Sequence, residues 1–285
     1  MRVALAVDIG GTKLAAGRVS DDGVLHDRAS VPCPADVDAE TWFGALAALV
    51  DGVRQGDEVV CGVGCGGPMT AGGEAVSPLN LPHVRRFALR ARLCELTGLP
   101  TAVDNDAKAL ALGEGWVGAA AGVDNFIAMV VSTGVGGGIV LDGRLLDGAD
   151  GNAGHIGHVI VEPDGRLCVC GGRGCLEAEA SGPSIAASTG RPAAEAPPKV
   201  RVRTGTLVGR AVASAANLLD LRLAVVAGSV ALGYGEVFFA AAQAELDARA
   251  RLDFSAGARI VPAGLGDAGP LVGAAAVGFR LLRSP

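Results

Sequence analysis

The chain has 285 residues, of which 50% are hydrophobic and only 4% aromatic, so its core is expected to be aliphatic. A net charge of −6 at pH 7 argues against a nucleic-acid surface, because phosphate contacts need clustered Lys and Arg. The sequence contains no leader-like segment and no apolar run long enough to span a membrane, so we expect a cytoplasmic protein with no membrane partner.

The first third of the chain alternates strand and helix patterns. An apolar run ending at Asp8, an alternating run from Lys13 and a third run from Val24 predict three strands. A helix over 39–54, a strand over 58–64 and a glycine-rich loop over 64–73 follow. A helix over 87–97, a strand over 100–106 and a helix over 107–118 complete this part.

The turn after the first strand reads "VDIGGTK". In this arrangement backbone amides and the Thr12 hydroxyl can bind a phosphate while Asp8 holds a hydrated Mg²⁺. An ordinary Gly-Gly hairpin turn explains the same letters. The chain lacks the GxxxxGK[ST] motif, and its glycines open hairpins where a dinucleotide-binding fingerprint would open a helix.

The stretch "VDNDAKALALGE" places Asp104, Asn105 and Asp106 at the junction of a strand and a helix. An acid in this position is often only a helix cap. Here two acids flank an amide that can bind a hydroxyl, close to a candidate phosphate loop, which favours a general base.

The second half repeats the opening pattern of strand, glycine turn, strand and "DG" turn, with "STGVGGG" as its glycine turn. This duplication predicts two related lobes, each with its own sheet. We expect residues 189–206 to form a surface loop. Helices over 207–219, 235–250 and 270–282 are expected to alternate with strands over 223–227 and 259–262.

His158, Cys168, Cys170 and Cys175 form the only spaced set of metal-ligand residues. Three thiolates and one imidazole fill a tetrahedral shell and leave no open position, which indicates a structural Zn²⁺. A set of reduced, metal-free thiols is the alternative. The remaining four cysteines lie in apolar or loop segments and are typical of small buried side chains.

Taken in order, "VDIGGTK", "DNDAKALALGE", "STGVGGGI", "GNAGHIGH" and "CVCGGRGCLE" make the chain resemble the ROK family of sugar kinases and sugar-responsive repressors. The resemblance implies an α/β protein with the two-lobed actin-like, ribonuclease-H-like ATPase fold. A small lobe would cover 1–104, with the helix in 268–285 packing back on it, and a larger lobe with the zinc loop would cover 105–267. ATP, Mg²⁺ and a structural Zn²⁺ would be the cofactors, and a homodimer the usual assembly.

The resemblance also implies a role for individual residues. Asp106 would accept the proton of the sugar hydroxyl that attacks the γ-phosphate, and the zinc would shape the loop that carries sugar-binding side chains. Substrate contacts would come from Gly66, Gly67, Asn80, Asn105, His155, His158 and Glu177. Mg²⁺ and the nucleotide would be bound by Asp8, Gly10, Gly11, Thr12, Lys13, Thr133, Gly134, Gly228 and Ser229.

One position departs from the family pattern. The family loop usually reads Gly-Glu-x-Gly-His, and this chain has His155 where the sugar-binding glutamate is expected. An imidazole offers one donor and one acceptor, so either the pocket prefers a different sugar or affinity depends on the protonation of His155. His155 could also pack beside the zinc loop or compete with His158 for the metal. Lys108 and the short stretch after Ser181 are smaller departures.

We therefore expect an ATP-dependent hexokinase-type enzyme, most simply one that converts glucose to glucose 6-phosphate. N-acetylmannosamine, N-acetylglucosamine and fructose are alternative substrates, and a sugar-binding protein without turnover is a further alternative. A repressor is not expected, since only seven residues precede Asp8 and leave no room for a DNA-binding domain.

Overall fold

The computed structural model describes residues 1–283, which divide into two compact units. Unit 1 comprises Met1–Ala121, Asp147–Ala153 and the C-terminal stretch from Leu265. Unit 2 comprises Gly122–Leu146 and Gly154–Gly264. The expected division placed residues 105–121 in the second lobe. The structure places them in unit 1, because helix α3 (Asp106–Val117) packs against helix α9 (Gly269–Leu281) of that unit.

Unit 1 is built on a five-stranded sheet of order β3-β2-β1-β4-β5. The antiparallel strands β1, β2 and β3 are joined by short turns, and β4 and β5 run parallel to β1. The strands are β1 Val3–Ile9, β2 Lys13–Ser20, β3 Leu25–Pro32, β4 Glu58–Cys65 and β5 Thr101–Asn105. The carboxyl ends of β1, β4 and β5 therefore meet at one edge of the sheet.

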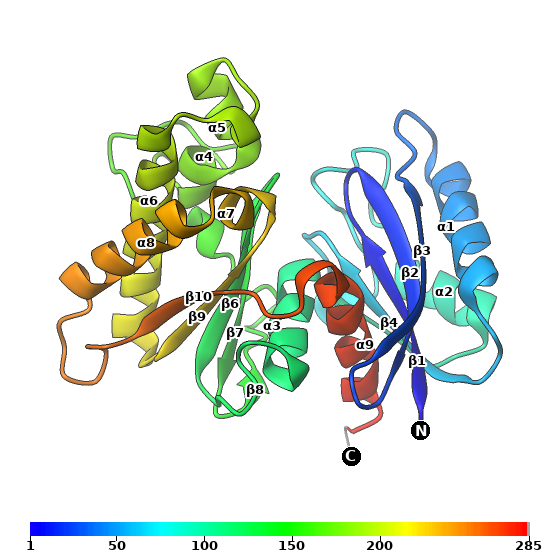
Figure 1. Ribbon diagram of the computed structural model, residues 1–285. Coiled ribbons are helices and arrows are strands. Elements are labelled where there is room, and N and C mark those ends of the chain that lie inside the picture. Colours follow the sequence, from blue (N-terminus) through cyan, green and yellow to red (C-terminus); the bar gives the residue numbers. More distant parts are fainter. Residues whose placement is uncertain (284–285) are drawn as a thin grey trace. The chain divides into compact units, whose positions relative to one another are not determined.

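Helices cover both faces of this sheet (Figure 1). Helices α1 (Ala39–Val53) and α2 (Leu89–Thr97) pack on the face to which β1 contributes Leu5 and Val7. Helix α9 packs on the opposite face, to which β1 contributes only alanines. Gly62 of β4 lies so close to α9 that a Cβ there would stand 2.0 Å from the Ala274 carbonyl oxygen. Small residues on this face thus permit close helix–sheet packing.

Unit 2 repeats the same sheet order as β8-β7-β6-β9-β10. Its strands are β6 Phe126–Val131, β7 Val135–Leu141, β8 Arg144–Leu145, β9 Leu223–Ala227 and β10 Arg259–Pro262. As in unit 1, the first hairpin is antiparallel and the later strands run parallel to the first. The duplicated strand-turn-strand pattern in the sequence therefore does correspond to two sheets of one topology.

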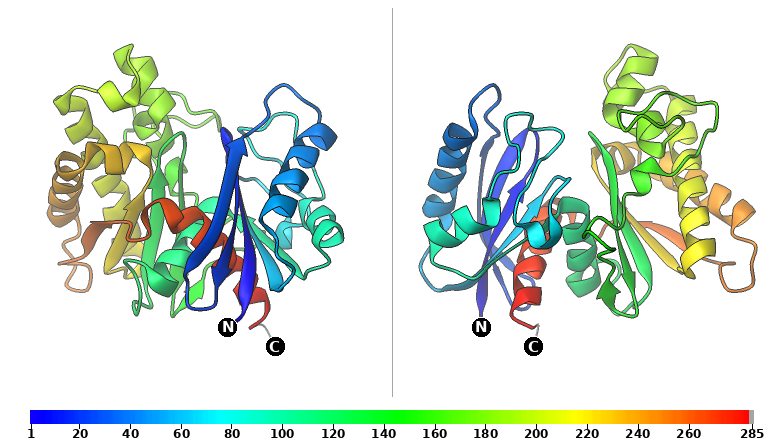
Figure 2. Two further views of the ribbon diagram at one scale, coloured as in Figure 1. Left: turned by 45° about the vertical axis from the view of Figure 1, so that its right-hand side comes forward. Right: turned by 180° about the vertical axis from the view of Figure 1, so that it is seen from behind.

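One face of the second sheet carries the largest apolar core of the protein, beneath helices α6 and α8 (Figures 1 and 2). Ile127 and Met129 of β6 are fully buried here, together with Phe238 of α8. The helices of unit 2 are α4 Leu176–Ala180, α5 Gly182–Thr189, α6 Pro198–Leu219, α7 Ser229–Tyr234 and α8 Glu236–Arg249.

The expected surface loop over 189–206 is wrong in its second part. Helix α6 begins at Pro198, nine residues before the expected start at Leu207. In the sequence, the alternating letters "KVRVR" and the glycine that follows are not typical of a helix. In the structure Thr204 and Gly205 are buried, and Gly205 lies against the Phe238 carbonyl oxygen. Packing on α8 therefore outweighs the weak local helix preference.

Across residues 1–283, helices that combine the length and the apolar character needed to cross a bilayer are absent.

Candidate functional site

The chemistry-bearing residues of unit 1 gather at the carboxyl ends of β1, β4 and β5. Asp8 is paired with Gly64 in the sheet, and Gly64 is paired with Asp104. A Cβ on Gly64 would lie 3.8 Å from Asp8 Oδ1 and 3.7 Å from the Asp106 Cα atom. Two acids expected to act in catalysis therefore flank one glycine at the sheet edge.

This proximity changes the acidity of Asp8. The pKa of the Asp8 carboxyl is raised from its ordinary value to about 7, chiefly by burial and also by the nearby negative charge of Asp106, while the positive charge of Lys13 acts in the opposite direction. A divalent cation at this position would compensate the charge of the two carboxylates. The donor set therefore fits the Mg²⁺ expected from the sequence.

Helix α3 begins directly at the catalytic candidate. Asn105 is its N-cap, with Oδ1 accepting from the Ala107 N–H at 3.0 Å, and Asp106 Oδ1 accepts from the same N–H at 2.9 Å. An aspartate at this position could have been the N-cap of α3, but the N-cap residue is Asn105. The Asn105 side-chain nitrogen takes no part in this cap.

The other expected sugar residues of unit 1 lie beside this helix start. A Cβ on Gly67 would lie 3.5 Å from Asn105 Nδ2, and one on Gly66 would lie 3.5 Å from Asn80 Oδ1. The Asn80 amide also lies against the phosphate-loop candidate, since a Cβ on Gly11 would come within 2.6 Å of Nδ2. The structure thus brings these residues together.

Thr12 and Lys13 are exposed in the β1–β2 turn, where the Gly10 N–H donates to the Lys13 carbonyl oxygen at 3.0 Å.

Lys108 lies one turn into α3 and is almost fully buried. Its Nζ is 3.0 Å from Asp104 Oδ1 and 2.7 Å from Asp147 Oδ1, and it donates to the Gly151 carbonyl oxygen at 3.2 Å. Arg280 of α9 pairs with the other Asp147 oxygen at 2.9 Å. This network fixes the segment Asp147–Ala153 to the helix that carries Asp106. In the sequence Lys108 is only a departure from the family pattern, because nothing local indicates partners 39 or more positions away.

In unit 2 the second glycine turn and the segment after β9 form one group. Ser132 Oγ and Ser229 Oγ are 2.9 Å apart, and a Cβ on Gly228 would overlap the Val131 carbonyl oxygen at 2.3 Å. Thr133 is exposed at the turn beside Gly134. The parallel pairing of β6 and β9 places these two segments at the same sheet edge. The four nucleotide residues expected in this half thus lie at one edge of the sheet.

Glu177 connects this turn to the cysteine cluster. Its Oε2 accepts from the Val135 backbone N–H at 2.9 Å, and a Cβ on Gly134 would lie 3.0 Å from the same oxygen. Cys175 is the N-cap residue of the short helix α4, and Glu177 follows it by two residues in the same helix. The helix therefore connects the cysteine cluster to the glycine turn.

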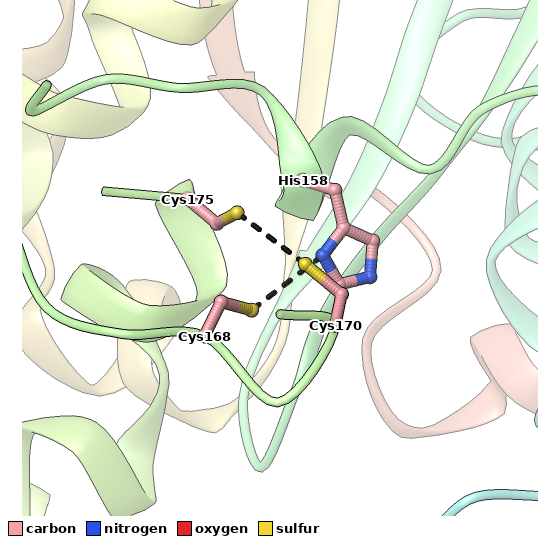
Figure 3. A group of neighbouring side chains, drawn as sticks. All are labelled: His158, Cys168, Cys170 and Cys175. Carbon is pink, nitrogen blue, oxygen red and sulfur yellow. Dashed lines mark hydrogen bonds between the residues drawn. The ribbon is translucent and has the colours of Figure 1, made fainter. Parts of the chain in front are cut away.

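The cluster itself consists of His158, Cys168, Cys170 and Cys175, whose ligand atoms all lie within 4.8 Å of one another. Figure 3 shows the four side chains pointing toward a common centre, with His158 Nδ1 3.7 Å from Cys168 Sγ and Cys170 Sγ 3.7 Å from Cys175 Sγ. Tetrahedral Zn²⁺ with Zn–S bonds of about 2.3 Å separates its sulfurs by about 3.8 Å. The donor atoms and their spacing therefore fit a closed structural zinc site.

The backbone of the zinc loop, which we define as residues 158–175, is shaped for this convergence. Gly171 and Gly174 have φ of +88° and +73°, and the Cys168 N–H donates to the Gly172 carbonyl oxygen at 2.8 Å. A side chain at Gly174 would overlap the Glu162 carbonyl oxygen at 1.6 Å. Glycine is needed at Gly174 for both reasons.

Glu179 binds the backbone of the zinc loop, a contact that the sequence does not predict. It is buried, accepts from the Arg166 backbone N–H at 2.6 Å and pairs with Arg203 Nη2 of α6 at 2.8 Å. These contacts hold the pKa of Glu179 below its usual range, although burial alone would raise it. The basic run at the start of α6 thus includes a structural anchor for the loop.

His155 lies outside the metal group. Its side chain is exposed, and its ring stacks on His158 with centroids 6.0 Å apart and an interplanar angle of 28°. Its backbone carbonyl accepts from the His158 N–H at 3.0 Å. His158 is the imidazole in the cluster, and His155 is left on the exposed side of it.

Comparisons with known proteins extend over almost the whole chain. The sequence model of the ROK family matches residues 4–279. The N-acetylmannosamine kinase of Citrobacter koseri is 39% identical over 246 residues, which cover 81% of this chain and 84% of that protein.

Two solved structures carry the fold comparison. The ROK hexokinase of Thermus thermophilus has a TM-score of 0.81 and 33% identity, covering 99% of both chains. The ROK family glucokinase of Streptomyces griseus, in complex with glucose and AMPPNP, has a TM-score of 0.85 and 30% identity, covering 98% of this chain and 99% of that one. They confirm the expected α/β fold of the actin-like class.

Proposed function

Because this chain belongs to the ROK family and is an ATP-dependent sugar kinase, we propose that the sugar it phosphorylates is N-acetylmannosamine. The observation that carries this proposal is the 39% identity to an N-acetylmannosamine kinase over 81% of the chain. It replaces glucose, which the sequence motifs alone had favoured, with a sugar that was among the alternatives.

His155 supports the same substrate. A glutamate at this position can accept hydrogen bonds from two hydroxyls, whereas a neutral imidazole offers one donor and one acceptor. An N-acetyl sugar has an acetamido group in place of one hydroxyl, and the carbonyl oxygen of that group can only accept a hydrogen bond, so it requires a donor. We assign the imidazole N–H of His155 to that carbonyl. His155 is exposed beside the zinc loop.

In the proposed reaction Asp106 accepts the proton of the attacking sugar hydroxyl. The side chain is held at the first turn of α3 by its hydrogen bond to the Ala107 N–H, and its second carboxylate oxygen is the proton acceptor. The amide groups of Asn80 and Asn105, above the glycines at 66 and 67, orient neighbouring hydroxyls. Such positioning supplies much of the rate enhancement in phosphoryl transfer.

The residues of unit 2 take the remaining roles. Oε2 of Glu177 is already occupied by the Val135 N–H, so its other oxygen is left to accept from a sugar hydroxyl. Backbone N–H groups at Thr133 and Gly134 bind phosphate oxygens, and the segment at Gly228 and Ser229 binds the adenosine. Zn²⁺, held by His158 and the three cysteines, supplies a rigid cross-link that fixes the zinc loop.

Asp8 and the turn that follows it would hold Mg²⁺ and the terminal phosphates. When bound, Mg²⁺ neutralises charge that develops on the phosphate oxygens. Lys13, exposed in the turn after Gly10 and Gly11, adds a positive charge next to Asp8, where it already lowers the pKa of that carboxyl.

Glucose is the second candidate, favoured by the similarity to the glucokinase whose structure contains glucose and AMPPNP. The test is ADP release from ATP and Mg²⁺ with N-acetylmannosamine, N-acetylglucosamine, glucose and fructose in turn. We expect turnover with N-acetylmannosamine that falls at least about 100-fold in Asp106→Asn, since general bases contribute factors of about 10² to 10⁴. Asp253→Asn, at an exposed residue, is the matched control. Absence of turnover with N-acetylmannosamine would refute the proposal.

A further inference from the structure

Unit 2 contains a pocket of about 510 Å³ that is separate from the residues assigned above to sugar, nucleotide and zinc. It is lined by residues of α5 and of the first turns of α6, together with Arg166 and Glu179. Its volume falls within the range of about 300 to 1,000 Å³ that is typical of small-molecule sites. The pocket is therefore large enough for a metabolite.

The charge of the pocket is opposite to that of the protein. Its lining includes four cationic side chains, from Arg166, Arg191, Lys199 and Arg203, and only one carboxylate, from Glu179. The chain as a whole has a net charge of −6. A concentration of positive charge in a concave region of an acidic protein favours an anionic ligand.

Two of these cations already have a partner, and two do not. Arg203 and Arg166 are 2.8 Å and 3.7 Å from Glu179 Oε2, and Arg203 is also 3.9 Å from Glu162. Across the described part of the chain, no carboxylate lies within 4.0 Å of the Arg191 guanidinium or the Lys199 ammonium group. These two side chains are exposed and available to bind a ligand.

The start of α6 adds to this preference. Pro197, Lys199 and Val200 line the pocket, so the amino-terminal end of a 22-residue helix opens into it. Pro198, the first residue of α6, has no N–H, and the Val200 and Arg201 N–H groups donate to the Pro197 carbonyl oxygen at 2.9 and 3.3 Å, so this end of the helix contributes mainly its dipole. The positive end of the helix dipole and the free cations therefore act on the same space.

The uncharged residues that line the pocket indicate which kind of anion it can bind. The hydroxyls of Ser188, Thr189 and Thr204 donate to helical carbonyl oxygens at 2.8 to 2.9 Å, so they are not available as donors. Ile185 and Val200 supply apolar surface. We propose that this pocket binds a small organic phosphomonoester, with the phosphate on Arg191 and Lys199 at the start of α6 and the organic part on the apolar side.

Occupation of the pocket has a consequence for catalysis that rests on the proposed function. Arg203 and Arg166, which pair with Glu179, line the same pocket as Arg191 and Lys199, so a phosphate bound there attracts their guanidinium groups and competes with Glu179 for them. Glu179 lies two residues after Glu177 in α4 and holds the Arg166 backbone of the zinc loop at 2.6 Å. A bound phosphomonoester would thus loosen the loop that carries the sugar contacts and raise the KM for sugar.

Isothermal titration calorimetry tests binding without turnover. The full chain is first saturated with AMPPNP, Mg²⁺ and both N-acetylmannosamine and glucose, so that the catalytic site is occupied whichever sugar it prefers. It is then titrated with N-acetylmannosamine 6-phosphate, glucose 6-phosphate or inorganic phosphate. We expect one equivalent of each sugar phosphate to bind, at least about ten-fold tighter than inorganic phosphate. The variant Arg191→Gln/Lys199→Gln should bind them at least about ten-fold more weakly, since charged hydrogen bonds are worth that factor or more.

The matched control is Arg222→Gln/Arg251→Gln, which removes the same charge from exposed positions of unit 2 outside the pocket. If only one sugar phosphate binds, the pocket is specific for that sugar; if both bind equally, it recognises the phosphomonoester. Absence of binding, equal affinity for inorganic phosphate, or equal affinity in both double variants would overturn the proposal. None of these outcomes depends on which sugar the enzyme phosphorylates.

Discussion

Glu177 Oε2 accepts a hydrogen bond of 2.9 Å from the backbone N–H of Val135, and this bond joins the helix after the zinc loop to the glycine turn at Ser132–Gly138. One carboxylate thereby touches the element proposed to bind phosphate and belongs to the element proposed to bind sugar. We therefore expect a substitution at Glu177 to affect both elements.

The first prediction follows from this bond. Glu177→Ala removes the acceptor for the sugar hydroxyl and the support of the glycine turn, so kcat/KM should fall about 10- to 100-fold, as expected for one charged hydrogen bond. Glu177→Gln keeps an oxygen for the Val135 N–H and should lose less. Steady-state kinetics on both variants decides the matter. Equal losses in the two variants would mean that the charge of Glu177, and not its contact with Val135, is what counts.

The second prediction concerns Lys108, whose charge is buried between Asp104 and Asp147. Lys108→Met removes the buried cation between these carboxylates and leaves them Arg280, at 2.9 Å from Asp147 and 3.9 Å from Asp104. Breaking a buried ion pair in this way costs about 3–5 kcal/mol. Urea unfolding should show a loss of this order. Lys199→Met, at an exposed lysine, should change the free energy of unfolding by less than about 0.5 kcal/mol. A loss below 1 kcal/mol in Lys108→Met would contradict the structural role.

The third prediction concerns the metal. Purified protein should contain one Zn²⁺ per chain, and Cys168→Ser should contain much less, because the closed shell loses one thiolate. We expect the Tm of this variant to fall by more than about 5 °C, since 1 kcal/mol corresponds to about 2–4 °C in a protein of this size class. Cys94→Ser, at an exposed thiol outside the cluster, should retain both zinc and Tm. Metal analysis and a melting curve test this together, and unchanged zinc in Cys168→Ser would rule out the assigned ligand set.

The fourth prediction is the pH dependence that arises from Asp8. Its pKa is about 7 in the folded protein and near 3.8 in the unfolded chain, so the stability linked to this group is present below pH 4 and is lost as the pH rises to about 7. In Mg²⁺-free buffer, Asp8→Asn should therefore gain stability relative to the wild type between pH 5 and pH 8, on the order of 2 kcal/mol, at about 1.4 kcal/mol per pKa unit. Urea unfolding at both pH values measures it. A difference that does not change with pH would show that Asp8 is not perturbed.

The sequence alone predicts the bounds of those helices and strands whose own apolar residues form the pattern that is buried in the core. The strands over 223–227 and 259–262 have the bounds expected for them, and the first helix was expected at 39–54 and lies at Ala39–Val53. Each of these segments has an uninterrupted apolar pattern. The spacing of His158 and the three cysteines likewise determined which side chains converge, because the ligands lie close together in the chain.

Features that depend on distant partners could not be derived in this way. Glu179 resembles any helical glutamate until Arg203 of α6 is brought beside it, and Lys108 resembles a surface lysine until Asp147 is brought beside it. The start of α6 was misjudged for the same reason. In all three cases tertiary packing, and not local preference, determines the outcome.

The most direct test of the proposed substrate is a competition between two sugars in one reaction. Equal concentrations of N-acetylmannosamine and glucose are incubated with limiting ATP and Mg²⁺, and the two sugar phosphates are quantified at early time by ³¹P NMR. Their ratio equals the ratio of kcat/KM values. We predict at least a ten-fold excess of N-acetylmannosamine phosphate, and a reduced excess in His155→Glu. A mixture dominated by glucose 6-phosphate would contradict the proposal and identify the chain as a glucokinase.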